Sequence, residues 1–323
     1  MKAWTLTVGT ALMATTALAA PANAAGKTAT CDRACLIRLT DAYVASFAKH
    51  SASGLPLAAN VAVVENVKRE KVGEGLWKDV TGGPTAFQVH VPDAQKQTAG
   101  WIGMVEREGK PTMVAVRLKL EGGRIVQAEQ LYAAVQGPAL NNVKTVRPGL
   151  AREVPAGARL SHDQLIRLGA SYYDALDDND GSKMPFAADC ERHENGMVTA
   201  GPKAGAGPGG PTPHPVARDC AGQLSSGVFT YIDHIDDRRV FAADPQTGLV
   251  MGLSHFHHPM NFTSYPVKAQ DGTIIQYTRD NQMKFAPFDM PAAHIFKVGA
   301  DHKVHEIEAM GFMAPLNSPT GRE

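Results

Sequence analysis

Residues 36–66 of this 323-residue chain read LIRLTDAYVASFAKHSASGLPLAANVAVVEN, and residues 165–195 read LIRLGASYYDALDDNDGSKMPFAADCERHEN. The two stretches share eleven of 31 residues at a constant offset of 129, which is 165 minus 36 and also 194 minus 65. The shared residues of the second stretch are Leu165, Ile166, Arg167, Leu168, Tyr172, Ser182, Pro185, Ala187, Ala188, Glu194 and Asn195. Solenoid repeats run about 20–50 residues, so this period indicates a whole small domain present twice.

The first copy predicts a helix followed by strands. Apolar residues recur at helical spacing within residues 32–49, and residues 61–64 form a short apolar run that predicts a strand. Further runs with strand character cover residues 101–106, 113–120 and 125–133, with glycine-containing turns between them. A helix followed by a meander of strands indicates an α+β domain, which we place at residues 25–135. Residues 136–160, with three prolines and no sustained period, are expected to be a linker.

The second copy is expected to span residues 161–315. Ser161 and Gln164 have the spacing of a capping box before an apolar run, and the acidic residues 177–181 are expected to end that helix. Residues 239–244 and 249–257 predict a hairpin, and residues 292–298 and 304–312 predict the closing strands. Two inserts, at 201–216 and 259–290, lengthen this copy, and the sequence leaves open whether they form a lid.

The first 24 residues have the pattern of a secretory signal peptide. Lys2 precedes an alanine-rich apolar stretch, and Ala22-Asn23-Ala24 provides small residues for cleavage after Ala24. We therefore expect a periplasmic or secreted protein with no stable membrane span. The formal net charge is zero, without a long basic stripe, which argues against a nucleic-acid partner.

All four cysteines lie after the predicted leader. An even count in an oxidising compartment favours disulfide bonds. We expect Cys190 to pair with Cys220, because this bond would close the most irregular loop of the chain. Cys31 and Cys35 then pair with each other or remain free.

The order of elements in the second copy resembles the nuclear transport factor 2-like (NTF2-like) superfamily, and more narrowly its SnoaL-like members. The resemblance rests on residues 238–244 (RRVFAAD), 248–253 (GLVMGL) and the closing hairpin with 296–298 (FKV) and 303–308 (KVHEIE). It implies two tandem cone-shaped domains, each a curved antiparallel sheet wrapped around helices, with an apolar cavity. Such folds pack sheet to sheet in pairs, which implies a homodimer or an internal pseudo-dimer. The superfamily includes isomerases, dehydratases, cyclases and lyases, as well as domains that only bind.

The second copy has ionisable residues where the first has apolar ones. His255 and His257 lie on one face of a predicted strand, and Tyr173 and Asp174 stand where the first copy has valine and alanine. A histidine, tyrosine or aspartate that lines an apolar cavity can transfer protons to and from a bound molecule. The predicted catalytic residues are His255, His257, Tyr173, Asp174, His193 and His234. Glu65-Asn66 and Glu194-Asn195 occur in both copies, so a structural role is expected for them.

The predicted function is that of a cofactor-independent lyase or isomerase acting on a small apolar molecule, aromatic or polyketide-like, in the cavity of the second domain. The first domain is expected to be a degenerate copy. Two alternatives remain open at this stage: a periplasmic small-molecule binding protein without turnover, and a metal-dependent enzyme with His255, His257 and His258 as candidate ligands.

Overall fold

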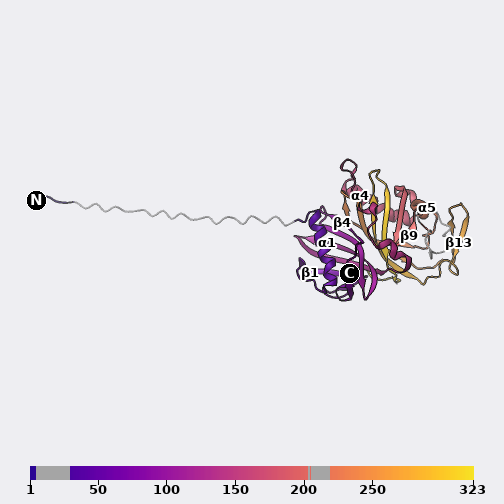
Figure 1. Cartoon of the computed structure of the whole chain (residues 1–323), viewed down its shortest axis with the longest axis horizontal. Helices are drawn as coiled ribbons and strands as arrows, with labels where there is room; N and C mark the ends of the chain where they lie inside the picture. The colour runs from indigo at the N-terminus through magenta and orange to yellow at the C-terminus, as the bar shows by residue number, and fades with distance from the viewer. Residues whose placement is uncertain (5–29, 203, 205–218) are drawn as a thin grey trace.

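The computed structural model describes residues 1–4, 30–202, 204 and 219–323. The predicted cleavage site after Ala24, most of the predicted signal peptide and most of the insert at 201–216 lie outside the described residues. Figure 1 shows the first half of the chain, from indigo to magenta, beside the second half, from salmon to yellow.

The repeat seen in the sequence is a repeat of structure. Helix α1 (Arg33–Ala48) and helix α4 (His162–Asp177) begin and end exactly 129 residues apart, as do strands β1 (Leu57–Glu65) and β8 (Phe186–Glu194). The capping box predicted at Ser161 is present, with the Ser161 side chain and that of Gln164 each accepting a backbone N–H. The first helix and the first strand of the two stretches therefore share their limits at the offset seen in the sequence.

The remaining elements are as follows. In the first half they are β2 (Lys68–Glu70), α2 (Leu76–Asp79), β3 (Val80–Gly82), β4 (Gln88–Asp93), β5 (Thr98–Arg107), β6 (Lys110–Glu121) and β7 (Arg124–Ala134). The connection contains η1 (Gly137–Val143), α3 (Pro148–Ala151) and η2 (Ala156–Ala158). In the second half they are η3 (Gly181–Lys183), β9 (Met197–Ala200), α5 (Cys220–Ser225), β10 (His234–Asp244), β11 (Leu249–His258), β12 (Ser264–Lys268), β13 (Ile274–Thr278), β14 (Phe288–Val298), β15 (Val304–Gly311) and β16 (Ala314–Pro315).

The two large sheets have the same topology. Sheet A has the order β2-β1-β7-β6-β5-β3, with β4 also paired to β5, and sheet B has the order β9-β8-β15-β14-β11-β10. The sequence predicted antiparallel sheets, and this was wrong for one pair in each sheet: β1 lies parallel to β7, and β8 lies parallel to β15. In each half the last strand of the meander returns to pair with the strand that follows the first helix, and that long connection allows a parallel pair.

Glu65-Asn66 and Glu194-Asn195 end these first strands, and the asparagines have identical roles. Asn66 and Asn195 both adopt positive φ, at 42° and 47°. The side chain of Asn66 exchanges two hydrogen bonds with the backbone of Tyr132, and that of Asn195 does the same with Gly311. The structural role expected for this asparagine is confirmed.

The two halves pack sheet against sheet. One hydrophobic cluster combines Ile102, Met104 and Leu131 of sheet A with Met251, Leu253 and Ile295 of sheet B, among others. The closest approach is at Gly100, where a Cβ atom would lie only 2.4 Å from Sδ of Met251. A side chain at position 100 would require Met251 to move, so the two sheets are in close contact here.

The opposite face of each sheet curls around its own helices. Helix α1 and the short helix α2 cover sheet A through a core that includes Tyr43, Phe47, Trp77 and Trp101, and α4 covers sheet B through Leu165, Tyr172 and Tyr173. Each half is thus a cone with its own core. The fold is α+β, as the sequence predicted.

The insert at 259–290 is more regular than expected. It contains the separate two-stranded sheet β12-β13, with its own small core around Met260, Tyr265 and Phe288. After β16 the chain returns to the first half (Figure 1), and Arg322 forms ion pairs with Glu129 of β7 and with Asp237 of β10.

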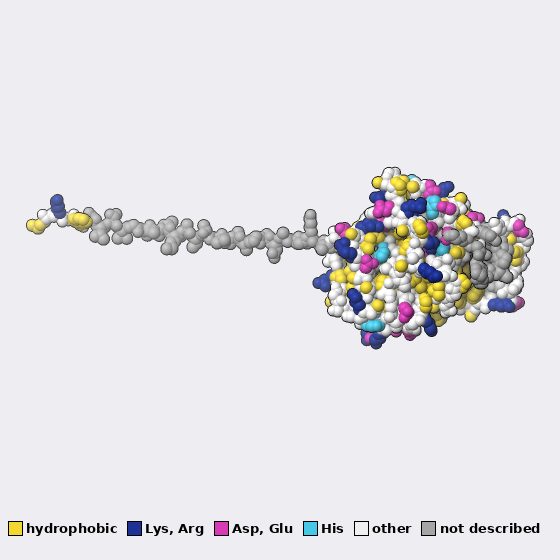
Figure 2. Space-filling model, viewed as in Figure 1, with side chains coloured by type: hydrophobic (Ala, Val, Ile, Leu, Met, Phe, Trp, Pro, Cys, Tyr) yellow, Lys and Arg dark blue, Asp and Glu magenta, His cyan; other side chains and the backbone are white. Residues whose placement is uncertain are grey.

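Two disulfide bonds join Cys31 to Cys35 and Cys190 to Cys220, which confirms the expected pairing. Among the helices of the described residues, none has the length and apolar character needed to cross a membrane. On the visible face of the described residues, basic and acidic side chains are interspersed (Figure 2).

Candidate functional site

One row of residues across each sheet shows how the two cones differ. In sheet A the ladder pairs Trp101 with Val116, Val116 with Gln130, and Gln130 with Glu65. In sheet B the equivalent ladder pairs Gly252 with His294, His294 with Ala309, and Ala309 with Glu194. A tryptophan and a glutamine of the first cone are therefore a glycine and an alanine in the second.

The first cone is filled. Trp77 and Trp101 are fully buried in it, and the rings of Tyr43 and Phe47 pack edge-on against Trp77. At its base Glu65 accepts hydrogen bonds from the Leu76 backbone and from the Gln130 side chain. Large aromatic side chains therefore occupy the interior of the first cone.

The second cone contains a small pocket. Its polar lining residues are Arg192, Glu194, Tyr231, His258 and His294, and its apolar lining includes Leu176, Phe229, Phe256 and Met290. These residues come from α4, β8, β11, β14, β15 and the segment after α5. Ala309, which stands in the row where the first half has Gln130, lines this pocket, whereas the space beside Gly252 is occupied by the side chain of Tyr173.

Arg192 supplies a buried positive charge to this pocket. It occupies the position of Val63 in the first half, at the offset of 129, and is 5% exposed. Its guanidinium donates hydrogen bonds to the Tyr172 hydroxyl at 3.0 Å, to Thr199 Oγ1 at 2.7 Å and to Glu194 Oε2 at 2.8 Å. Burial alone would lower the pKa of Arg192, but Tyr172 and Glu194 outweigh it, so its pKa is raised and the charge is permanent.

His294 lies between the two tyrosines of α4 and Phe296. Its Nδ1 is 3.4 Å from the Tyr173 hydroxyl, and its ring centroid is 5.2 Å from that of Tyr172. Burial, reinforced by the positive charge of Arg192, lowers the pKa of His294 to about 3. Burial also raises the pKa of Tyr173. At neutral pH the pair is therefore an uncharged imidazole beside an uncharged phenol.

His258 and Tyr231 form the opposite side of the pocket. The imidazole of His258 stacks on Phe288, with ring centroids 4.1 Å apart, and lies 5.2 Å from the ring of Tyr231. Burial lowers the pKa of His258 to about 4, and burial together with Glu194 raises the pKa of Tyr231. The pocket thus has uncharged donors and acceptors around the Arg192–Glu194 ion pair.

Of the six residues predicted to be catalytic, Tyr173 alone lies in this cone. Asp174, its neighbour on α4, points outward, with Oδ1 3.1 Å from Nη1 of Arg238. His193 alternates with Arg192 along β8 and lies on the other face of the sheet, hydrogen-bonded to Glu191 at 2.6 Å. The expected proximity of Asp174 and His193 to the cavity was wrong, because each is displaced by one residue from a position that faces inward.

His255 and His257 share one face of β11, as predicted, but that face points away from the cone, toward the first half. His255 lines a small space between the halves together with Glu129 and Arg239. His234, at the start of β10, is exposed and stacks on His257 at a centroid distance of 4.2 Å. The predicted metal ligands His255, His257 and His258 therefore do not converge, because His258 lies on the opposite face of the strand.

Sequence reasoning missed Arg192, Tyr231 and His294, and named His258 only as a metal ligand. Arg192 could have been found from the repeat, since it replaces Val63 at the fixed offset. His294 could not have been found in this way, because the inserts of the second copy lie before β14 and the offset of 129 residues no longer applies there. The ladder pairs make β5 the counterpart of β11 in the first half.

Comparisons with known proteins single out the second half. Residues 158–311, from just before α4 to the last residue of β15, match the model of a family described as a domain of unknown function (DUF8021). No curated protein matches the chain. Among solved structures, a "putative polyketide cyclase" from Silicibacter sp. TM1040 is similar at 13% identity with a TM-score of 0.29, over 48% of this chain and 91% of that chain. A likeness this distant carries no conclusion about activity.

Proposed function

We propose that the second half is a SnoaL-like domain that transfers protons to and from a small, mainly apolar molecule in its cone, as a lyase or isomerase without a cofactor. The observation that carries the proposal is the pair His294–Ala309, which lines the pocket with an uncharged imidazole and a small side chain near a buried arginine. The filled row of the first half supports its assignment as a degenerate copy.

The chemistry follows from charge and position. An uncharged imidazole with a pKa lowered to about 3 accepts a proton only weakly at rest. A substrate that places a developing anion beside Arg192 would stabilise the protonated imidazole as the proton is transferred. Tyr173, within 3.4 Å of His294, would hold the imidazole in one orientation. Elimination and isomerisation next to a carbonyl group need such a base and such a charge.

Export is part of the proposal. The leader pattern and the two disulfide bonds both support an oxidising compartment outside the cytoplasm. A binding protein without turnover is the second candidate, because the three hydrogen bonds of Arg192 already satisfy much of its donor capacity.

The test uses the chain from residue 25 and a panel of small aromatic and polyketide-like ketones. Binding is followed by ligand-observed NMR and turnover by mass spectrometry. We expect His294→Gln to lower turnover about 10²- to 10⁴-fold, with little change in binding. Ala309→Leu, which refills the cone, should abolish binding. Arg167→Gln, an exposed change on α4, is the control and should alter neither.

The outcomes separate the candidates. Binding that is lost in Ala309→Leu, without turnover of any ketone, would favour the binding protein over the enzyme. Turnover that persists unchanged in both His294→Gln and Ala309→Leu would show that the cone of the second half is not the site.

A further inference from the structure

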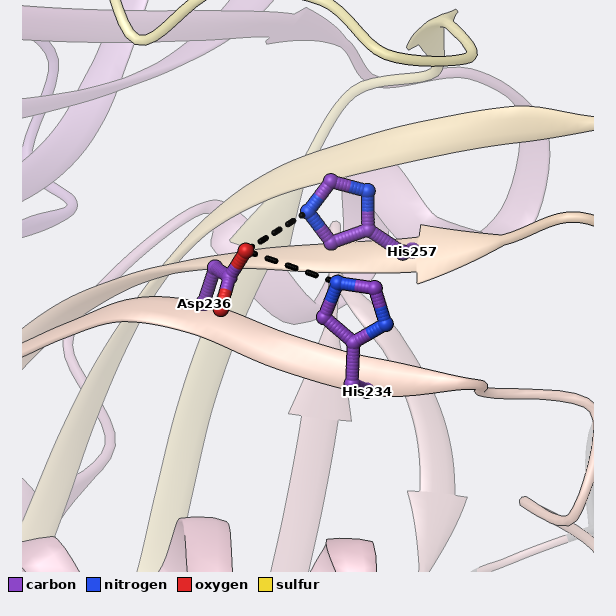
Figure 3. Close-up of side chains that lie close together, drawn as sticks. All are labelled: His234, Asp236 and His257. Atoms are coloured by element: carbon purple, nitrogen blue, oxygen red, sulfur yellow. Dashed lines mark ion pairs between the residues drawn. The ribbon is translucent and has the colours of Figure 1, made fainter.

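A second group of ionisable residues lies outside the cone, on the face of sheet B that carries His255 and His257. Figure 3 shows its core: His234 and Asp236 extend from β10, and His257 extends from the neighbouring strand β11. In the ladder His234 is directly opposite His257, and Asp236 is two residues further along the same face. Two rigid strands thus bring three metal-ligating side chains to one point.

The spacing of the three ligand atoms is that of a chelating site. Oδ2 of Asp236 lies 3.4 Å from Nε2 of His234 and 3.4 Å from Nε2 of His257. These separations are longer than most N–H···O hydrogen bonds. Two ligands on one tetrahedral zinc ion, each bound at about 2.0–2.1 Å, lie roughly 3.3 Å apart. The carboxylate and the two imidazoles therefore need little movement to share an ion.

Each imidazole is also backed by a second carboxylate. Nδ1 of His234 is hydrogen-bonded to Asp233 at 2.7 Å, and Nδ1 of His257 lies 2.9 Å from Oδ1 of Asp289. A carboxylate on one ring nitrogen holds the proton there and leaves the lone pair of the other nitrogen for a metal. In both rings that other nitrogen is the Nε2 that faces Asp236.

Asp289 gives independent support. It is 0% exposed, and its Oδ1 faces Nδ1 of His257 at 2.9 Å. Its other oxygen accepts a hydrogen bond from the backbone N–H of Ser318 at 2.8 Å. A buried carboxylate is costly without a compensating charge, and a cation on the far nitrogen of His257 would strengthen the N–H that this ring offers to it.

We propose that His234, Asp236 and His257 bind a divalent cation that accepts both nitrogen and oxygen ligands, with Zn²⁺ as the ion to test. Two imidazole nitrogens and one carboxylate oxygen suit zinc and its neighbours better than calcium or magnesium, which need several oxygen ligands. Asp236 and His234 are exposed and His257 is partly exposed, so a water molecule can take the fourth position. The ion would join the start of β10 to the end of β11, on the opposite face of the sheet from the pocket.

The test is isothermal titration calorimetry, in which ZnCl2 is added to the chain from residue 25. The protein is purified without a histidine tag and treated with EDTA beforehand. We expect one ion per chain at micromolar affinity or tighter, and a higher melting temperature with zinc. Loss of a ligand in Asp236→Asn or His234→Gln should weaken binding at least about 100-fold, and Asp233→Asn should weaken it about 10-fold. Both ligand residues named here are exposed, and circular dichroism checks that the variants fold.

His305→Gln is the matched control. His305 is also held by two carboxylates, Asp189 at 2.7 Å and Asp301 at 2.9 Å, but among the described residues it belongs to no group of three ligand atoms that lie close to one another. This change should leave zinc affinity unaltered. The proposal is overturned if zinc does not bind, or if binding survives both Asp236→Asn and His234→Gln. Loss in His255→Gln alone would also overturn it, because the ion would then lie in the buried triad of His255, His257 and Asp289.

Discussion

Glu65 and Glu194 occupy equivalent positions but make different contacts. In the first half Glu65 accepts hydrogen bonds from uncharged donors, and burial raises its pKa. In the second half Glu194 pairs with Arg192, a residue that has no charged counterpart in the first. The arginine at the position of Val63 thus gives the glutamate at the base of the second cone a charged partner, whereas the glutamate of the first cone has only uncharged donors.

His294 should make the protein sensitive to acid. In the folded state its pKa is lowered to about 3, whereas in the unfolded chain it is near the ordinary value of about 6.5. Between these values the unfolded state binds more protons, so the free energy of unfolding decreases as the pH falls from 6.5 toward 3. His294→Phe should remove roughly 1 kcal/mol of this decrease per pH unit. Urea denaturation at pH 7, 5.5 and 4.5 measures the free energy of unfolding of the unchanged protein and of His294→Phe. The same pH dependence in the two proteins would contradict the prediction.

The disulfide bonds contribute at the scale of the elements they join. Cys190 on β8 and Cys220 at the start of α5 are 30 residues apart, and Cys31 and Cys35 only four. Because stabilisation grows with the length of the closed loop, the Cys190→Ala, Cys220→Ala variant should lose about 3–4 kcal/mol of unfolding free energy. Guanidinium denaturation measures this loss. The Cys31→Ala, Cys35→Ala variant should lose less, and the reverse order would refute the argument.

Periodicity predicted the elements well and their arrangement less well. The limits of α1 and α4 follow from helical spacing and capping residues, which are local signals, whereas the strand expected at residues 61–64 is longer and spans Leu57–Glu65. The parallel pairing of β8 with β15 is non-local and leaves no trace in either strand alone. Alternation placed His255 and His257 on one face of β11 correctly, but only the packing of the whole sheet decides which face lines the cone.

At the scale of the whole molecule, the contact between Gly100 and Met251 joins the two halves. Gly100→Ala would place a Cβ 2.4 Å from Sδ of Met251 and should cost about 1–3 kcal/mol. Met251→Ala should cost about 2–5 kcal/mol through the cavity it leaves. Because the residues touch, the double variant should be more stable than the sum of the two losses implies. Strict additivity in chemical denaturation would show that the sheets do not meet there.

The contact between Gly100 and Met251 limits which recombination events between the two coding segments the protein can tolerate. Two newly duplicated copies would have carried the same residue on each outer sheet face, but a glycine on β5 now receives a methionine from β11. A crossover or gene conversion that made the two coding segments alike again would place methionine against methionine, or glycine against glycine. Selection against such exchange would keep the two segments on separate evolutionary courses, which suits a molecule in which one cone is filled and the other is open.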